Sequence, residues 1–511
     1  MTPSRRSPTS TSNSPHHALI SNNLYQTTEA VPSIPPTTNS TTEYQIMSPP
    51  PKPTFKPTLI LHGGAGQIAR PSLPPSLWKK YHSSLLSYLR STRTLLENGA
   101  TALDAAVHAV SLMEDDELFN CGRGSVFTTA GRIEMEASVM VTSVLPDRDV
   151  TERAEALKRG AGVIGLRNVR HPIRLAREVL VRNGVDEDGD GDGGSMHSQL
   201  SGGYVEELGR GWGLEFMPDE WFWTRKRWEE HRRGLGFEEG KTGLEEELMF
   251  DSDGLGYGYP SQGTVGCVCL DQWGDLAVAT STGGLTNKLP GRVGDTPTLG
   301  AGFWAEAWEE AGRDSPEISD MQYLRQMQTM RDSYHDAEAK SLWDMTLADC
   351  FPGLPPFMRE SSSSVPRQSF NIPNEKLKPR YTPKKRRAVA VSGTGNGDSF
   401  LRTAAARTTC AMMRFSERGL SLEKAVSAVA GADGELQRSA GRRWGKTGEG
   451  AGGIIGIEVE IDNDVADSGW ALRHGKVVFD FNCGGMFRAW VDEGPDGGDV
   501  EHVMVFKEAY Q

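Results

Sequence analysis

A group of hydroxyl, amide and charged side chains crowds into one short stretch in the middle of the chain. Its members are, in chain order, Thr264, TSTGG (280–284), Asn287, Arg292 and Asp295. A threonine hydroxyl is a weak nucleophile unless a base lies beside it. If the peptide bond before Thr264 is cut, the freed α-amino group becomes that base, because its pKa is about 7.7–8.0.

The residue before Thr264 suits such a cut. Gly263 has no side chain, so it tolerates a strained backbone and lets the hydroxyl approach the preceding carbonyl. A threonine that follows glycine is also an ordinary way to start a strand. The spacing alone therefore leaves both interpretations open.

Two other glycine-rich segments could bind phosphate or an oxyanion. GTGNGDSF (393–400) follows a predicted strand and precedes a predicted helix, as a dinucleotide-binding loop does, but Phe400 stands where the third glycine should be. HGGAG (62–66) is similar to the oxyanion segment of lipases, but the chain has no GxSxG nucleophile elbow. Neither segment by itself indicates an activity.

The elements around these segments mix strands and helices. Apolar periodicity predicts a strand in TLILHGGAG (58–66) and a hairpin formed by 264–270 and 276–282. Helices are expected at 77–97 with Ser76 as N-cap, at 101–116 with a capping box of Thr101 and Asp104, at 171–183, and from 397 to about 417. Further strands are expected near 388–392, 452–460, 476–481 and 502–506. The pattern predicts an α+β fold with antiparallel hairpins and helices on sheet layers.

Three segments differ in composition from this body. Residues 1–57 hold 11 prolines and 19 serines or threonines, which predicts a disordered tail. An acidic glycine-rich insertion is expected at about 185–203, and a proline- and serine-rich one at about 307–387. The second ends in a basic run, KPRYTPKKRR, which is a solvated loop or, through residues 384–387, a nuclear localisation signal; the loop is the favoured interpretation.

Charge and cysteine usage exclude several classes of protein. The formal net charge of −13 argues against a nucleic-acid-binding protein, and no apolar run is long enough to span a membrane. The six cysteines include no CxxC pair, so neither a disulfide scaffold nor a zinc ribbon is indicated. We expect a cytoplasmic protein, with a nuclear location as the alternative.

Seven segments, taken together, resemble one known family. They are HGGAG (62–66), DDELFNCGRGSVFTTAGRIEMEASVMV (115–141), HPIRLAREV (171–179), WFWTRKRW (221–228), GTVGCVCLDQWGDLAVATSTGGLTNKLPGRVGD (263–295), GTGNGDSFLR (393–402) and FNCGGMFR (481–488). In this order they resemble the plant-type L-asparaginase/isoaspartyl peptidase family of N-terminal nucleophile hydrolases. The most specific match is GTVG followed by TSTGG and TNKLPGRVGD.

The resemblance implies a fold and an activity. It implies a four-layer αββα sandwich in a single catalytic domain, 58–511, that cuts itself between Gly263 and Thr264 into an α chain and a β chain (264–511). The product is expected to be a threonine amidohydrolase that converts L-asparagine or N-terminal β-aspartyl (isoaspartyl) dipeptides to L-aspartate.

The resemblance also implies residue roles. Thr264 would be the nucleophile, Thr282 would orient it, and Asn120 would lie nearby. Thr394 and Gly395 would form the oxyanion hole. Arg292 would hold the substrate α-carboxylate, because a planar guanidinium grips a carboxylate with two hydrogen bonds. Asp295 would hold the α-ammonium. The remaining substrate-binding positions would be Val293, Gly294, Asn396 and Gly397.

Partners and alternatives follow from the same likeness. We expect no cofactor, although a structural sodium ion could be held by backbone carbonyls near 113–124, and we expect a homodimer of αβ units. GFWAE (302–306) is more similar to the threonine aspartase branch, so a site-specific threonine endopeptidase is one alternative. A non-catalytic scaffold with a partner-binding insert is another. Asp295 favours a substrate with a free α-amine. The insert of 307–387 lies between the Arg292 and Thr394 segments, so we expect it to cover or reshape the mouth of the site.

Overall fold

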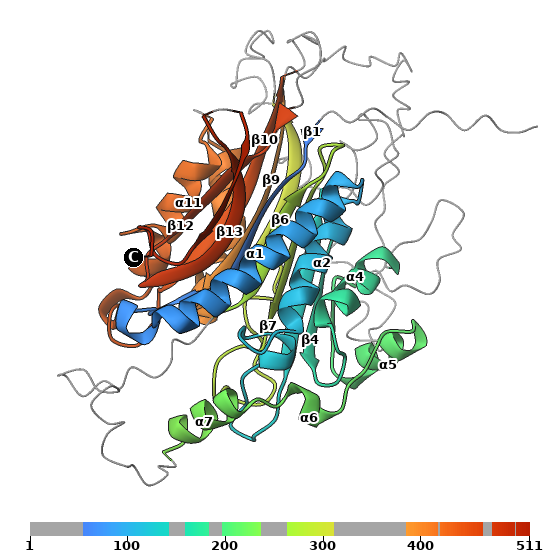
Figure 1. Ribbon diagram of the computed structural model, residues 1–511, viewed down its shortest axis with the longest axis vertical. Coiled ribbons are helices and arrows are strands. Elements are labelled where there is room, and N and C mark those ends of the chain that lie inside the picture. The colour runs from blue at the N-terminus through green and yellow to red at the C-terminus, as the bar shows by residue number, and fades with distance from the viewer. Residues whose placement is uncertain are drawn as a thin grey trace, which may run out of the picture. The chain divides into compact units, whose positions relative to one another are not determined.

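An eight-stranded sheet is the largest element of the computed structural model (Figure 1). The model describes residues 55–142, 159–182, 197–236, 263–310, 385–416, 419–462, 473–495 and 497–510. The strand order of this sheet is β14-β13-β2-β6-β7-β3-β4-β5. Its strands are β2 Thr58–Gly66, β3 Met135–Val141, β4 Arg159–Leu166, β5 Gln199–Ser201, β6 Val265–Leu270, β7 Leu276–Thr282, β13 Gly485–Glu493 and β14 Asp499–Met504.

A second sheet has four strands in the order β12-β10-β9-β8. Its strands are β8 Phe303–Glu310, β9 Lys385–Gly395, β10 Gly452–Asp462 and β12 Lys476–Phe481. All of their pairings are antiparallel. A separate two-stranded ribbon joins β1 (Phe55–Lys56) to β11 (Arg473–His474) in parallel.

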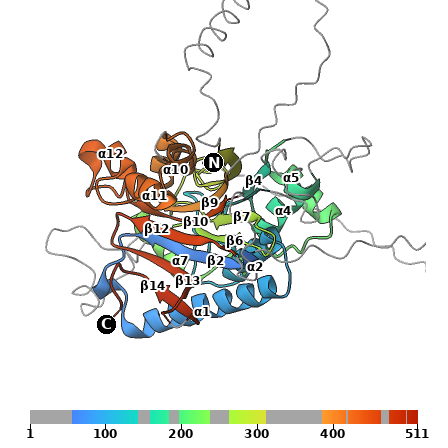
Figure 2. The ribbon, with the colours of Figure 1, turned by 90° about the horizontal axis from the view of Figure 1, so that it is seen from above.

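Helices flank the two sheets (Figure 2). The α-helices are α1 Pro75–Glu97, α2 Ala102–Glu114, α4 Pro172–Arg182, α5 Gly203–Gly211, α6 Asp219–Phe222, α7 Arg225–Gly234, α9 Gly397–Thr403, α10 Ala405–Arg414, α11 Leu422–Ala430 and α12 Glu435–Ser439. Short 3-10 turns occur at Arg70–Ser72, Gly122–Gly124 and Gly441–Arg443. None of the described helices is both long and apolar enough to cross a membrane.

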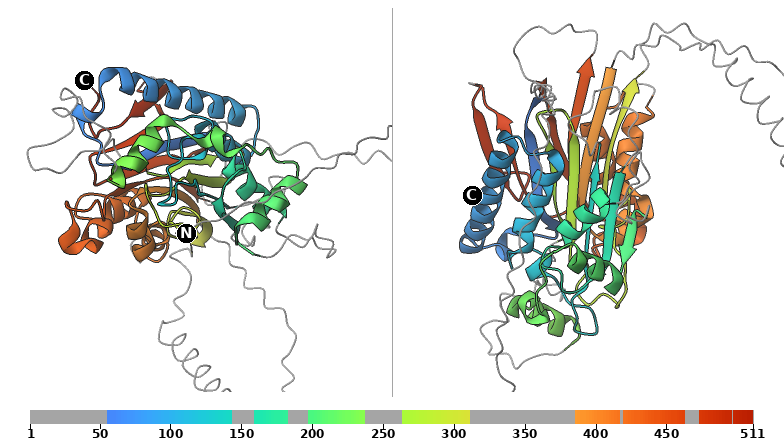
Figure 3. Two further views of the ribbon diagram at one scale, coloured as in Figure 1. Left: turned by 90° about the horizontal axis from the view of Figure 1, so that it is seen from below. Right: turned by 90° about the vertical axis from the view of Figure 1, so that its right-hand side faces the viewer.

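The strands β6 and β7 are buried on both faces. Val265 and Cys267 belong to the apolar cluster that also contains the buried residues of α1, α2 and α4, whereas Val268 and Val278 belong to the cluster that contains residues of the second sheet. A strand that is covered on both sides has a nearly continuous apolar sequence, and the sequence VGCVCL of β6 is of this kind. A third cluster fills the space between β9, β10 and the helices α10 and α11. Figure 3 (right) shows strands of the two sheets running side by side with helices on the outer faces.

The α+β class predicted from the sequence is confirmed, and so are most local signals. The Thr101 hydroxyl accepts a hydrogen bond from the Asp104 nitrogen at 3.1 Å, as the capping-box spacing predicts. The N-cap of α1 is Pro74, so Ser76 lies inside the first turn and its assignment as the cap is wrong. The single helix expected after residue 397 is two helices, because Ala404 takes a left-handed conformation with φ of 45°.

The expected boundaries of the tail and of both insertions need correction. Phe55 is buried and pairs with Arg473, so order begins before Thr58. The last residues of the 185–203 segment form β5, which extends the large sheet. The ends of the 307–387 segment belong to β8 and β9, which pair as far as Glu310 and Lys385. Residues 1–54, 185–196 and 311–384, which include the acidic run, lie outside the described residues.

The end of the basic run is neither a solvated loop nor an accessible signal. Arg386 and Arg387 lie in β9 and are buried, and Arg387 forms an ion pair with the buried Glu458 on β10. Arg387 also lies 5.8 Å from the ring of Trp308. An arginine is tolerated at such a position because a carboxylate and an aromatic face replace the water that it loses.

The attachment points of the 307–387 insert lie away from the oxyanion segment. β8 begins beside Gly302, and β9 ends at Gly395, where Gly393 donates a hydrogen bond to the Gly302 carbonyl at 2.7 Å. The insert leaves from the opposite ends of these strands, about 23 Å away at the usual rise per residue. The insert therefore joins the fold at the strand ends away from Thr394, and the expectation that it covers or reshapes the mouth of the site concerns residues outside the described ranges.

Candidate functional site

The face between the two sheets changes from apolar to polar at one end of the strands. Strand register pairs Glu136 with Thr282, and continuing the β6–β7 ladder by one residue places Thr264 opposite Thr282. Residues directly opposite each other point to the same face of a sheet. Thr264, Thr282 and Glu136 therefore form one polar row across three strands, directly beyond the apolar layer.

A second row, with three polar members, lies two residues farther along the same strands, next to the apolar layer. Its members are His62, Gly266, Thr280 and Ser138. Burial lowers the pKa of His62 to about 3, so its ring is neutral near pH 7. Its Nε2 lies 2.8 Å from the Ser392 hydroxyl on the second sheet. An imidazole this weakly basic is a poor general base, which leaves that task to another group.

A small pocket opens beside the first row. It is lined by Gly263, Thr264, Thr282, Gly284, Leu285, Arg292, Asp295, Gly395 and Gly397. Its cavity volume is about 20 Å³, which is about enough for one water molecule. Gly263, the residue before Thr264, is itself part of this lining.

Gly263 lies directly against the predicted oxyanion donors. A methyl group on its Cα would come within 2.5 Å of Thr394 Oγ1 and 2.9 Å of the Gly395 nitrogen. Gly395 itself has φ of 144°, a conformation open to glycine, and a side chain there would overlap the Ala451–Gly452 backbone. Gly263 and the two predicted oxyanion donors are therefore close neighbours.

The Thr264 hydroxyl has a neighbour that we did not predict from the sequence. Its Oγ1 lies 2.8 Å from Oγ1 of Thr296, and both residues are buried. The predicted partner, Thr282, instead accepts a hydrogen bond from the Gly284 nitrogen at 3.0 Å. The only sequence signal for Thr296 is the hydroxyl that directly follows Asp295 in GDTP.

Arg292 and Asp295 lie together across the pocket. The Arg292 Nη2 and the Asp295 carboxylate both pack against the Cα of Gly397, and Arg292 donates to Asp398 at 3.1 Å. Burial raises the pKa of Asp295 to about 7, and the Arg292 charge only partly opposes this effect. Asp295 Oδ2 has no hydrogen-bond partner among the described residues. A cationic group would satisfy it.

Buried groups behind the pocket hold the loop that carries Arg292. Glu136 accepts a hydrogen bond from the Gly294 nitrogen at 2.9 Å, and burial raises the pKa of this carboxyl. The Lys288 ammonium donates to the Gly283 carbonyl at 2.8 Å, which fixes the turn after Thr282. We did not predict either residue, although the alternation in MEASVMV places Glu136 on the face that carries Ser138.

The remaining predicted residues support the pocket without lining it. Asn120 donates to the Gly284 carbonyl at 2.8 Å and accepts from the Val126 nitrogen at 3.1 Å, so it ties two loops together. Asn396 caps α9 through the Ser399 nitrogen. Val293 is 41% exposed. Gly284 and Leu285 line the pocket and were missed.

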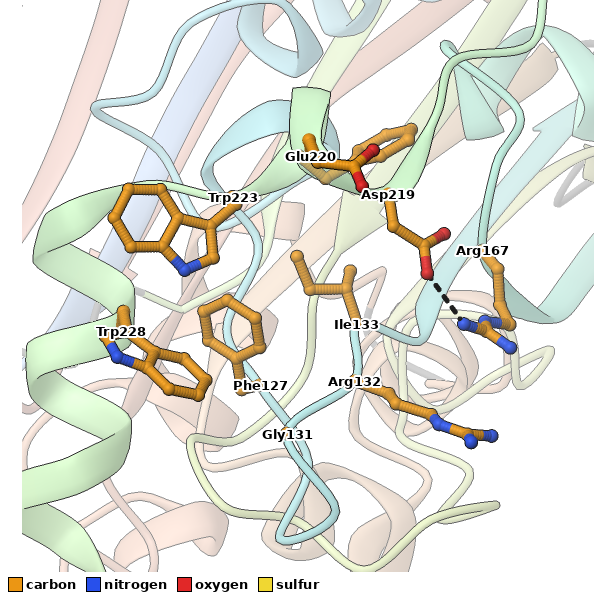
Figure 4. A pocket seen from close by; sticks show the side chains of 10 residues that line it. Phe127, Gly131, Arg132, Ile133, Arg167, Asp219, Glu220, Trp223 and Trp228 are labelled. Atoms are coloured by element: carbon orange, nitrogen blue, oxygen red, sulfur yellow. Dashed lines mark hydrogen bonds and ion pairs between the residues drawn. The ribbon is translucent and has the colours of Figure 1, made fainter.

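A larger cavity of about 360 Å³ lies elsewhere, between the 127–133 hairpin and helices α6 and α7 (Figure 4). Phe127, Trp223 and Trp228 form its aromatic wall, and Arg167 pairs with Asp219 at its edge. It contains no nucleophile beside a base, so its size does not make it the reaction site. In the described part of the chain, no cluster of three or more His, Cys, Asp or Glu side chains could hold a metal ion.

Replacing Gly263 tests the crowding at the predicted cut. In Gly263→Ala the new methyl group would overlap Thr394 Oγ1 and the Gly395 nitrogen and shift the backbone of residue 263, so we expect self-cleavage to slow about 10- to 100-fold. Densitometry of intact and cut chain on a denaturing gel measures the rate. Gly211→Ala is the control, because a methyl group there meets nothing within 4 Å. Equal rates in both variants would contradict the crowding argument.

Comparison with known proteins identifies the family of the chain. A family model described as asparaginase matches residues 55–311. An isoaspartyl peptidase of Salmonella typhimurium is 29% identical over 456 residues, which are 89% of this chain and 99% of the relative. An isoaspartyl peptidase of Escherichia coli is 36% identical over 251 residues (49% of this chain, 68% of the relative), and an isoaspartyl peptidase/L-asparaginase of Danio rerio is 32% identical over 256 residues (49% and 67%). Because the family model covers half of the sequence, from β1 past the Thr264 strand to the end of β8, this chain belongs to the asparaginase family.

Proposed function

We propose that the chain cuts itself between Gly263 and Thr264 and then hydrolyses L-asparagine, N-terminal β-aspartyl dipeptides, or both, to release L-aspartate. The observation that carries the proposal is the contact of Gly263 with Thr394 Oγ1 and the Gly395 nitrogen, next to the Thr264 hydroxyl. Thr394 Oγ1 and the Gly395 N–H lie beside the Cα of Gly263, next to the bond that is cut, and this pair of donors is available to stabilise the oxyanion of a bound substrate. The names of the relatives agree with the substrates.

Self-cleavage begins with attack of the Thr264 oxygen on the Gly263 carbonyl carbon. A carbon–oxygen bond forms, the peptide carbon–nitrogen bond breaks, and the hydroxyl proton ends on the nitrogen, which becomes the α-amine of Thr264. Water then hydrolyses the ester and leaves a carboxylate on Gly263. Departure of the Gly263 end opens the pocket that is nearly filled in the intact chain.

Turnover uses the same hydroxyl with a new base. The α-amine of Thr264 takes the hydroxyl proton while the oxygen attacks the side-chain carbonyl of the substrate. Thr394 and the Gly395 N–H stabilise the resulting oxyanion, and such a donor typically contributes about 2.7–4 kcal/mol. Ammonia or an amino acid leaves with a proton from the amine, and water hydrolyses the acyl ester on Thr264.

Recognition of the substrate rests on Arg292 and Asp295. The guanidinium pairs with the substrate α-carboxylate, and the buried Asp295 carboxylate pairs with its α-ammonium. An internal aspartate of a protein has no free α-ammonium, so the buried acid favours a free amino acid or an N-terminal residue over an endopeptidase substrate.

The proposal also includes the layer arrangement of the fold, a bound sodium ion and a dimer. The three core clusters support a four-layer αββα sandwich of the N-terminal nucleophile hydrolase type. A sodium ion held by carbonyls near 113–124 would stiffen the loop that carries Asn120, and the carbonyls of Glu117 and Phe119 already converge on Gly124. A dimer of αβ units completes the expected assembly.

The first test is the cut itself together with a substrate panel. We expect the wild type to give two chains, with N-terminal sequencing of the second starting at Thr264, and Thr264→Ala to stay intact and inactive. The processed enzyme should release aspartate from asparagine or β-aspartyl dipeptides. A β chain with another start would sink the mechanism, and cleavage of a folded aspartate-containing protein without ammonia release from asparagine would favour the endopeptidase.

Removing the guanidinium separates substrate binding from processing. Arg292→Ala should raise KM about 10- to 150-fold, the loss expected for hydrogen bonds to a charged group of about 1.5–3 kcal/mol, while the chain still cuts itself. Steady-state kinetics and a denaturing gel read the two effects. Arg90→Ala is the control, because Arg90 forms an exposed ion pair with Glu501. If Arg292→Ala also stops the cut, the role of Arg292 is structural.

The raised pKa of Asp295 predicts a pH dependence of substrate affinity. The carboxylate that binds the α-ammonium is present above pH 7 and lost below it, so KM should rise about tenfold between pH 8 and pH 6. The α-amine base titrates in a similar range but acts on kcat. In Asp295→Asn, KM should be high and independent of pH. A wild-type KM that stays constant over this range would refute the assignment of Asp295.

A further inference from the structure

The closest hydroxyl to the future nucleophile in the intact chain is that of Thr296. The two Oγ1 atoms are 2.8 Å apart, and Thr296 is fully buried. The Thr282 hydroxyl accepts a hydrogen bond from the Gly284 N–H. The hydrogen bond seen at Thr264 Oγ1 thus comes from the loop after Asp295 and not from the neighbouring strand.

We infer that Thr296 is the positioning residue for self-cleavage: its hydroxyl aligns the Thr264 hydroxyl with the Gly263 carbonyl. This inference rests on the proposed function, because it concerns the same cut. After the cut, the new α-amine of Thr264 supplies a base and a second polar handle, so orientation passes to the residues around that amine. Thr296 then belongs to maturation rather than to the recognition of substrate.

Thr296 is held rigidly enough for this task. Its carbonyl accepts hydrogen bonds from the hydroxyls of Ser138 at 2.5 Å and Thr280 at 3.5 Å. The carbonyl of the preceding Asp295 accepts from the nitrogens of Thr298 at 3.0 Å and Gly302 at 3.1 Å. These bonds fix the backbone on both sides of the Thr296 Cα, and the complete burial of the residue leaves its side chain little room to rotate.

The chemistry needs such an acceptor. When Thr264 donates its proton toward Thr296 Oγ1, a lone pair of the Thr264 oxygen is left to attack the Gly263 carbon. Gly263 is already confined by Thr394 and Gly395 on its other side, so fixing the hydroxyl completes the alignment of the reacting atoms. Thr296 gains and loses no net proton, because the hydroxyl proton ends on the departing nitrogen.

Three variants test the inference by the rate of the cut. Full-length chain is pulse-labelled in a cell-free translation and followed on a denaturing gel. Thr296→Val removes the hydroxyl at nearly constant size and should slow the cut about tenfold or more, and Thr296→Ser should restore it to within about threefold. Thr409→Val is the matched control, because Thr409 is equally buried but bonds only within α10, to the Ala405 carbonyl.

The cleavage rates of the two Thr296 variants decide the inference. Slow Thr296→Val with rescued Thr296→Ser, at an unchanged Tm, supports the inference. A wild-type rate in Thr296→Val overturns it, and so does failure of Thr296→Ser to restore the cut, since the role would then be one of packing. An uncut wild-type chain would instead refute the proposed function, so the two failures are distinguishable.

Discussion

The register between β6, β7 and β3 is the constraint on which the site depends. In that register Thr282 faces Glu136, and one further step of the β6–β7 ladder brings Thr264 opposite Thr282. A slip of one residue would turn every one of these side chains to the helical face and bring Ser281 in their place. The apolar residues farther along the same strands prevent such a slip, because Val268 and Val278 would leave the layer between the sheets. The alternation of side chains between the two faces of these strands thus determines both the packing of the core and the position of the polar site residues.

The second sheet supplies the predicted oxyanion donors of the site. β9 brings Ser392 and Thr394 over the polar rows, and its last residue, Gly395, turns its nitrogen toward Gly263. Tight sheet-on-sheet packing leaves little free space there, which explains why the pocket holds about one water molecule while the chain is intact. The enzyme that we propose therefore makes its own substrate cavity by removing a piece of its backbone from a packed position.

Much of this could be predicted from local patterns. The hairpin of β6 and β7, the capping box of α2 and the grouping of Thr264, Thr282, Arg292 and Asp295 all lie within short stretches of sequence. The oxyanion segment came only through family likeness, because nothing local tells a strand such as β9 which sheet it will face. Thr296 was missed because its importance depends on a contact across 32 residues.

Long-range contacts also explain the errors. The basic run suggested solvent exposure, but a buried carboxylate on β10 and an aromatic ring on β8 make an interior position acceptable for Arg387. The break at Ala404 arises beside the loop 300–301, where the Ala406 and Arg407 nitrogens donate to the Ala301 and Gly300 carbonyls. β13 was missed because its glycine-rich start resembles a loop.

The pairing of Glu310 with Lys385 has a consequence for how this chain could have grown. Two residues joined across an antiparallel ladder are neighbours, so whatever lies between them closes a loop whose ends are already together. The entropic cost of lengthening such a loop rises only with the logarithm of its length. Residues can therefore be added or deleted between Glu310 and Lys385 during evolution without shifting the strand that carries Thr394. The loss of folding free energy grows only slowly with the length of the added segment.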